Sequence, residues 1–180
     1  VIYSTKRPKA DQSPYESIEA GLASCTGLSF MLIDACRSVG IPARFVGTPM
    51  WYNNSGNHSW VEIWDNGWHF TGAFEPTGDR LNEGWFASLA ARAVEGHPEY
   101  GIYAATWKKT GVFFPMDWKP GIEKYYAYDV TSSYQKYLDD NFVPLRIKVV
   151  GKNGMRKKVL VDVKADDGFL FSGYSNDESN

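Results

Sequence analysis

Two side chains of this 180-residue sequence, Cys25 and His58, have the types and the order needed for chemistry at a thiol. A cysteine attacks a carbonyl carbon as its thiolate, and a nearby histidine takes up and returns the proton. Ser24 is a candidate N-cap, which would place Cys25 in the first turn of a helix. Because the helix dipole and free amide hydrogens stabilise an anion there, this position favours a reactive thiolate.

The second cysteine, Cys36, lies eleven residues along the same expected helix. That separation is about three helical turns, or roughly 16 Å, whereas a disulfide needs Cα atoms within about 7 Å. The two thiols are therefore not expected to pair. We interpret Cys36 as a small buried hydrophobic residue, which is the usual role of a cysteine inside an apolar helix.

Three histidines compete for the role of base. His58 begins an alternating, aromatic-rich run over 58–64, directly after a flexible loop. His69 lies in a second such run over 68–74, where a cross-strand contact is the simpler interpretation. His97 lies in a Gly-His-Pro turn, which is typical of a surface loop. We therefore take His58 as the candidate base.

The two runs are joined through Asn-Gly, the strongest short signal for a β-hairpin. Counting back along both strands from a two-residue turn places His58 opposite Glu75. Opposed residues share a face of the sheet, with Cβ atoms about 5 Å apart, so a carboxylate there could orient the imidazole. A bulge at Gly72 would shift the register by one residue and bring Phe74 or Pro76 opposite His58 instead.

The remaining pattern predicts an α+β domain followed by a β-rich extension. Helices are expected over 14–22, 25–39 and 81–95, strands over 41–47, 58–64 and 68–74, and irregular structure or short strands over 100–130. After Pro144, alternation over 145–150 and 159–163 around a turn predicts a separate hairpin. We divide the chain into a core over 1–142 and the start of a truncated β-sandwich module over 143–180. Because the sequence begins at Val1, we expect further domains in a longer protein.

Composition excludes several classes of function. The net charge of -2 gives no reason to expect nucleic acid or an anionic membrane as a partner. No apolar stretch approaches the roughly 18 to 20 residues of a membrane span. The histidines are isolated and no C-x-x-C or H-x-x-x-H spacing occurs, so neither a metal nor another cofactor is expected.

Three stretches together resemble the transglutaminase-like superfamily, namely 23–27 around the cysteine, 35–44 with its Gly-Ile-Pro-Ala-Arg turn, and 57–64 with His-Ser-Trp-Val-Glu. The resemblance covers roughly residues 14–90. It implies a papain-like core, in which the cysteine helix packs on an antiparallel sheet, and a Cys-His-Asp triad.

Carried over residue by residue, the resemblance makes Cys25 the nucleophile and His58 the base. The aspartate of the family's Asp-Pro-Thr stretch corresponds to Glu75, one methylene longer, with Asp79 and Asp65 as fallback candidates. The Cys25 backbone N–H would supply part of an oxyanion hole, with Gln12 as a candidate second donor.

The walls of a substrate cleft are expected from small residues beside the cysteine and from the tryptophans. These candidates are Ser24, Thr26, Trp51 and Trp60. The expected partner is a peptide or protein whose peptide or amide bond is hydrolysed through a Cys25 thioester. Two alternatives stay open: protein crosslinking by transglutamination, and a non-catalytic domain that binds a peptide or glycan.

The compartment does not follow from the sequence; an exported location, periplasmic or at the cell surface, is consistent with the resemblance to multi-domain bacterial proteins.

Overall fold

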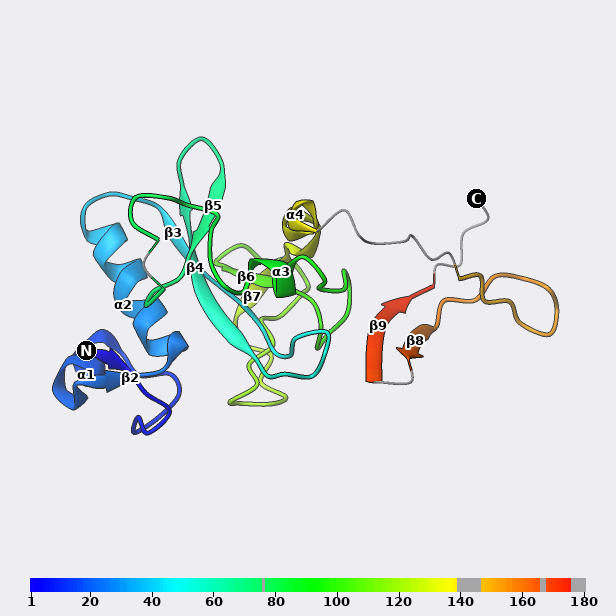
Figure 1. Cartoon of the computed structure of the whole chain (residues 1–180), viewed down its shortest axis with the longest axis horizontal. Coiled ribbons are helices and arrows are strands. Elements are labelled where there is room, and N and C mark those ends of the chain that lie inside the picture. The colour runs from blue at the N-terminus through cyan, green and yellow to red at the C-terminus, as the bar shows by residue number, and fades with distance from the viewer. Residues whose placement is uncertain (76, 139–146, 166–167, 176–180) are drawn as a thin grey trace.

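The centre of the molecule is an antiparallel sheet with strand order β5-β4-β3-β6-β7 (Figure 1). The computed structural model describes residues 1–75, 77–138, 147–165 and 168–175. The strands of the sheet are β3 (Ala43–Thr48), β4 (His58–Trp64), β5 (Trp68–Thr71), β6 (Tyr103–Thr106) and β7 (Tyr126–Asp129). With helices packed on the sheet, the α+β class is confirmed.

Two helices precede the sheet, close to where the sequence predicts them. In α1 (Pro14–Ala20), Ser13 and Glu16 form a reciprocal capping box, and Gly21 ends the helix with φ 66°. A short parallel pair, β1 (Ile2–Tyr3) and β2 (Leu22–Ala23), brings the amino-terminal segment alongside this helix end. The longer helix α2 (Cys25–Ser38) follows β2 directly, with Ser24 as its N-cap. Cys25 and Cys36 are both free thiols, as expected.

Apolar residues are buried on both faces of the sheet, because each strand alternates between two cores. The core on the α2 side contains Ile33, Phe45, Val61, Phe114 and Met116, among others. The core on the opposite face contains Trp51, Trp60, Phe70, Phe86 and Tyr134, and it is covered by α3 (Ala87–Ala90) and α4 (Thr131–Tyr134) with the 3₁₀ turn Gln135–Tyr137. Strand β4, between β5 and β3, is therefore buried on both faces, and its first residue, His58, pairs with Thr48, the last residue of β3.

The helix predicted over 81–95 is wrong except for the single turn of α3. Asn82 adopts φ 61°, and its side-chain oxygen accepts the Phe70 N–H at 3.1 Å, as a strand neighbour would. Trp85 is held by a hydrogen bond to Glu75 at 3.0 Å. These tertiary contacts hold the first part of the segment outside the helical region, which helix propensity cannot foresee.

The carboxy-terminal strands differ from their predicted pairing. The expected turn is present, since Val150 bridges to Arg156 around it, but β8 (Leu160–Ala165) pairs with β9 (Gly168–Tyr174) instead of with the described residues 147–150. Residues 145 and 146, and the proposed boundary at 142, lie outside the described residues. In the described part of the chain, no helix is long and apolar enough to cross a membrane.

Candidate active site

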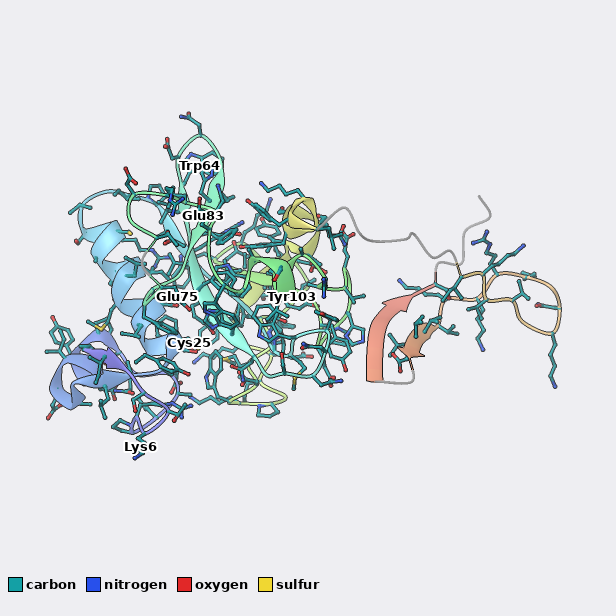
Figure 2. All side chains as sticks on the ribbon, viewed as in Figure 1. Lys6, Cys25, Trp64, Glu75, Glu83 and Tyr103 are labelled. Atoms are coloured by element: carbon teal, nitrogen blue, oxygen red, sulfur yellow. The ribbon has the colours of Figure 1, made fainter. Side chains whose placement is uncertain are left out.

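The start of α2 is fixed by its capping residue. Ser24 accepts the Gly27 N–H through its hydroxyl at 3.5 Å and donates to the Ala10 carbonyl at 2.8 Å. This second bond ties the amino-terminal segment to the helix start. As a result, Cys25 stands on the first turn of α2 (Figure 2), where His58 and Ser59 of β4 act on its thiol.

Cys25 is in an environment that favours its thiolate. Burial raises the pKa of the Cys25 thiol, but the hydrogen bond and the charge of His58 outweigh this effect. The backbone N–H groups of Ser59 and Thr26 also act on the sulfur and lower the pKa further. The net result is a Cys25 pKa below its ordinary value, as the helix-start position predicts.

His58 is the first residue of β4 and is 4% exposed. Its ring is enclosed by the rings of Trp51, Trp60, Phe74, Trp85 and Phe86, with centroid distances from 4.9 to 6.2 Å. Burial lowers the pKa of His58, but interaction with the Cys25 thiol and with Glu75 outweighs burial and raises the pKa. The aromatic enclosure limits water access and so strengthens both interactions.

The third member of the arrangement is Glu75, whose Oε1 lies 3.1 Å from His58 Nε2. The ring hydrogen does not point squarely at this oxygen, so the contact combines a bent hydrogen bond with an attraction of charges. Glu75 Oε1 also accepts Trp85 Nε1–H at 3.0 Å, and Oε2 accepts the Phe74 N–H at 3.2 Å. Burial raises the pKa of Glu75, but His58 first and Trp85 next outweigh it, so that the pKa falls below its usual value. With Nε2 facing Glu75, Nδ1 is the nitrogen left for the thiol.

The route by which Glu75 reaches His58 differs from the predicted one. The predicted hairpin register is wrong by one residue, because Trp64 pairs with Trp68 around a three-residue loop in which Asn66 has φ 51°. Strand β5 ends at Thr71, and the chain then leaves the sheet and returns with Glu75 beside His58. In the observed register, the residue opposite His58 would be Phe74, but Phe74 lies in this loop and not in β5.

Gly72 makes this return possible. A Cβ atom at Gly72 would overlap the Glu75 carboxylate and lie 2.8 Å from the Glu75 Cβ, so only glycine lets the side chain fold back against the backbone. The sequence marked this glycine as a possible bulge. Its role in the structure is to make room for the carboxylate.

The two fallback carboxylates lie elsewhere. Asp65 is exposed at the hairpin tip, where Asn66 donates to its side chain at 3.2 Å. Asp79 is exposed in the loop after Glu75. Within the part of the chain that the structure describes, no recorded contact joins either of them to His58.

The family comparison bears on this same region. Residues 1–73 match the sequence model of the transglutaminase-like superfamily. The match covers less than half of the chain. The matched segment contains Cys25 and His58 and ends two residues before Glu75, a shorter span than the resemblance over 14–90 noted from the sequence.

Similarity to other proteins is limited. No curated protein matches the chain. Among solved structures, the crystal structure of "a Putative Cysteine Protease" from Cytophaga hutchinsonii is similar, with 22% identity and a TM-score of 0.36. The similarity covers 41% of this chain and 26% of that chain, so this chain spans about a quarter of that protein. The family match supports a thiol-dependent activity at the level of the superfamily.

Within the matched segment, Gln12 is 1% exposed and holds the backbone. Its Nε2 donates to the Leu22 carbonyl at 3.0 Å and to the Glu16 carbonyl at 3.3 Å. These two bonds use both amide hydrogens. An oxyanion role for Gln12 would therefore require it to give up one of these carbonyls.

The residues expected to line a substrate cleft are buried. Trp51 and Trp60 are 2% and 0% exposed and belong to the core opposite α2, where Trp60 Nε1–H donates to the Tyr134 hydroxyl at 2.8 Å. Ser24 caps the helix, and the Thr26 hydroxyl is within 3.2 Å of that of Ser59. The expectation that these four residues line a substrate cleft is corrected, because all four are buried and offer a substrate little surface.

Accessible aromatic side chains near His58 include two that the sequence did not single out, Trp85 and Tyr3. Trp85 is 57% exposed, with its ring centroid 5.0 Å from that of His58. Phe74 stacks on Tyr3 at 4.4 Å, and Tyr3 is 46% exposed. No local signal marks Trp85 or Tyr3, which the fold brings in, and Tyr3 arrives through the β1–β2 pairing.

The other two histidines have structural roles. His69 Nδ1 lies 2.8 Å from Asn82 Nδ2, and its Nε2 lies 3.0 Å from the Asp65 carbonyl. The expected surface role of His97 is wrong: it is 4% exposed, burial lowers its pKa, and its Nδ1 accepts two backbone N–H groups of its own turn at 3.1 Å each.

Proposed function

We propose that the chain is a thiol enzyme that hydrolyses a peptide or amide bond through an acyl-enzyme on Cys25. The observation that carries the proposal is the 3.1 Å contact of His58 Nε2 with Glu75 Oε1, on a histidine that also interacts with a thiol at a helix start. A nucleophile, a base and a group that orients the base are the three parts such chemistry needs.

In the first half of the reaction, the Cys25 thiolate attacks the substrate carbonyl carbon, and a C–S bond forms. The negative charge that develops on the carbonyl oxygen falls near the first turn of α2, where the Cys25 N–H has no intrahelical acceptor. As the tetrahedral intermediate collapses, the C–N bond breaks and the His58 imidazolium gives its proton to the leaving amine. The product is a thioester.

In the second half, His58 takes a proton from water, and the resulting hydroxide attacks the thioester carbonyl. The C–S bond breaks, the carboxylic acid leaves, and the thiolate–imidazolium pair is restored. Glu75 keeps the ring oriented and stabilises its charged form throughout. Four tryptophans could have walled a tunnel for a lysine side chain. Trp51 and Trp60 are buried in the core, whereas Trp64 and Trp68 pack against each other at the tip of the β4–β5 hairpin. This arrangement favours hydrolysis over transfer to an amine.

The proposal is tested with a small activated ester such as p-nitrophenyl acetate. We expect a burst of one nitrophenolate per molecule and an acetyl group on Cys25 detected by mass spectrometry, both abolished in Cys25→Ala. Adding a labelled primary amine separates the two outcomes of the thioester. Release of acetate without incorporation of label supports hydrolysis, whereas labelled amide product would assign transferase activity.

A further inference from the structure

We propose that an apolar groove next to the catalytic pair binds a segment of the polypeptide substrate in which an apolar side chain is flanked by lysine or arginine. This inference rests on the proposed function and names its substrate class. The groove has a volume of about 540 Å³, a size suited to a few side chains. Its walls are largely apolar and include Met50, Pro98, Phe113, Pro115 and Ile122.

The groove begins where β3 and β4 end, at the histidine. Thr48 pairs with His58, and the residues that immediately follow Thr48 line the groove. Asp117, also in the lining, accepts a hydrogen bond from Asn57, the residue before His58, at 2.5 Å. A peptide bound in this groove would therefore lie beside the end of β4 at which His58 stands.

A second attachment ties the groove to the cysteine. Lys119, another lining residue, forms an ion pair with Asp11 at 2.8 Å. Asp11 follows Ala10, whose carbonyl accepts the hydroxyl of the α2 cap, Ser24. The lining segment is thus joined by the Lys119–Asp11 ion pair to the stretch that contacts the α2 cap, and by the Asp117–Asn57 hydrogen bond to the residue before His58. These two contacts place the groove on the same side of the chain as the segments that lead to both reacting groups.

The charges at the groove select the flanking residues of the occupant. Glu99 and Glu123 line it with exposed side chains, and no ion pair is recorded for either within the described residues. The positive charge of Lys119 is offset by Asp11, and that of Arg7 acts on Asp117. Two carboxylates therefore remain to attract cations beside apolar walls, and an acidic peptide would be repelled.

Binding is measured on the full chain carrying Cys25→Ala, so that the result does not depend on turnover. The probes are two fluorescent, unstructured peptides, one with a phenylalanine between two lysines and one with the same phenylalanine between two glutamates. We expect the lysine peptide to bind about tenfold more tightly, since two exposed charge pairs contribute modestly each. The preference should shrink at high salt because of screening.

The double reversal Glu99→Lys/Glu123→Lys should invert the preference, whereas the single control reversal Glu19→Lys on α1 should leave it intact. Replacing the phenylalanine of the peptide by glycine should weaken its binding both to the Cys25→Ala protein and to the double-reversal protein. Equal binding of the two peptides, or a preference that survives the double reversal, would overturn the proposal. The proposal would also be overturned if the protein self-associated and the double reversal abolished this self-association. That result would assign the groove to a second copy of the chain. Because a burst on Cys25 is measured separately, failure of the groove and failure of the enzyme are distinguishable.

Discussion

Replacing Glu75 by glutamine removes the charge that faces His58 while keeping the shape of the side chain. At 3.1 Å and an effective dielectric of about 20, the attraction is about 5 kcal/mol before desolvation is subtracted, which sets an upper bound. Contacts to charged groups contribute about 1.5 to 3 kcal/mol net. Since about 1.4 kcal/mol is a factor of ten in rate, kcat/KM should fall about 10- to 100-fold.

The pH profile separates an orienting role from a structural one. Glu75 raises the pKa of His58, and the thiolate–imidazolium form is lost as pH rises through that pKa. Removing the carboxylate charge should therefore move the alkaline limb of activity to lower pH, and Glu75→Asp should restore part of the loss. The control is Glu83→Gln, a partly exposed carboxylate paired with Arg80 at 3.3 Å. Wild-type kcat/KM together with an unmoved alkaline limb in Glu75→Gln would refute the reasoning.

Three further substitutions test the surroundings of the site. Gly72→Ala would place a Cβ atom on the Glu75 carboxylate, so activity should fall at least as far as in Glu75→Gln. The control Gly67→Ala, whose added Cβ meets an ordinary contact at 3.7 Å, should leave activity unchanged. Equal activity of Gly72→Ala and Gly67→Ala would contradict the account. Tyr134→Phe removes a hydroxyl that donates to Glu62 at 2.6 Å and accepts from Trp60 at 2.8 Å. The free energy of unfolding, measured by urea denaturation, should fall by about 3 kcal/mol. A fall of less than about 1 kcal/mol would show that these hydrogen bonds are dispensable. Cys36→Ala should keep the acetyl burst, and loss of the burst would give this second thiol a role in the chemistry.

The positions of Cys25 and His58 could be predicted because their signals are local. A capping serine and an apolar period fix the helix start, and an alternating run fixes the strand. Each signal lies within a few residues of the side chain that it positions. The contact between His58 and Glu75 was anticipated from a register that proved wrong, since a loop, and not a ladder, carries the carboxylate back.

What could not be predicted depends on contacts between distant parts of the chain. The burial of Trp51 and Trp60 follows from the second core, which forms only when α3 and α4 cover the far face of the sheet. Likewise, Tyr3 reaches Phe74 only through the pairing of β1 with β2. A single sequence records the aromatic type of each residue, but not which face of the fold it will meet.

The central claim is that His58 activates the Cys25 thiol, and pH-dependent alkylation tests it most directly. The two cysteines provide an internal comparison, since the pKa of Cys25 is lowered whereas burial raises that of Cys36. At about pH 6, where an ordinary thiol is almost entirely protonated, iodoacetamide labelling followed by peptide mass spectrometry should modify Cys25 at least tenfold faster than Cys36. His58→Ala should abolish this advantage. Equal labelling of the two cysteines, or an advantage that His58→Ala leaves intact, would contradict the account.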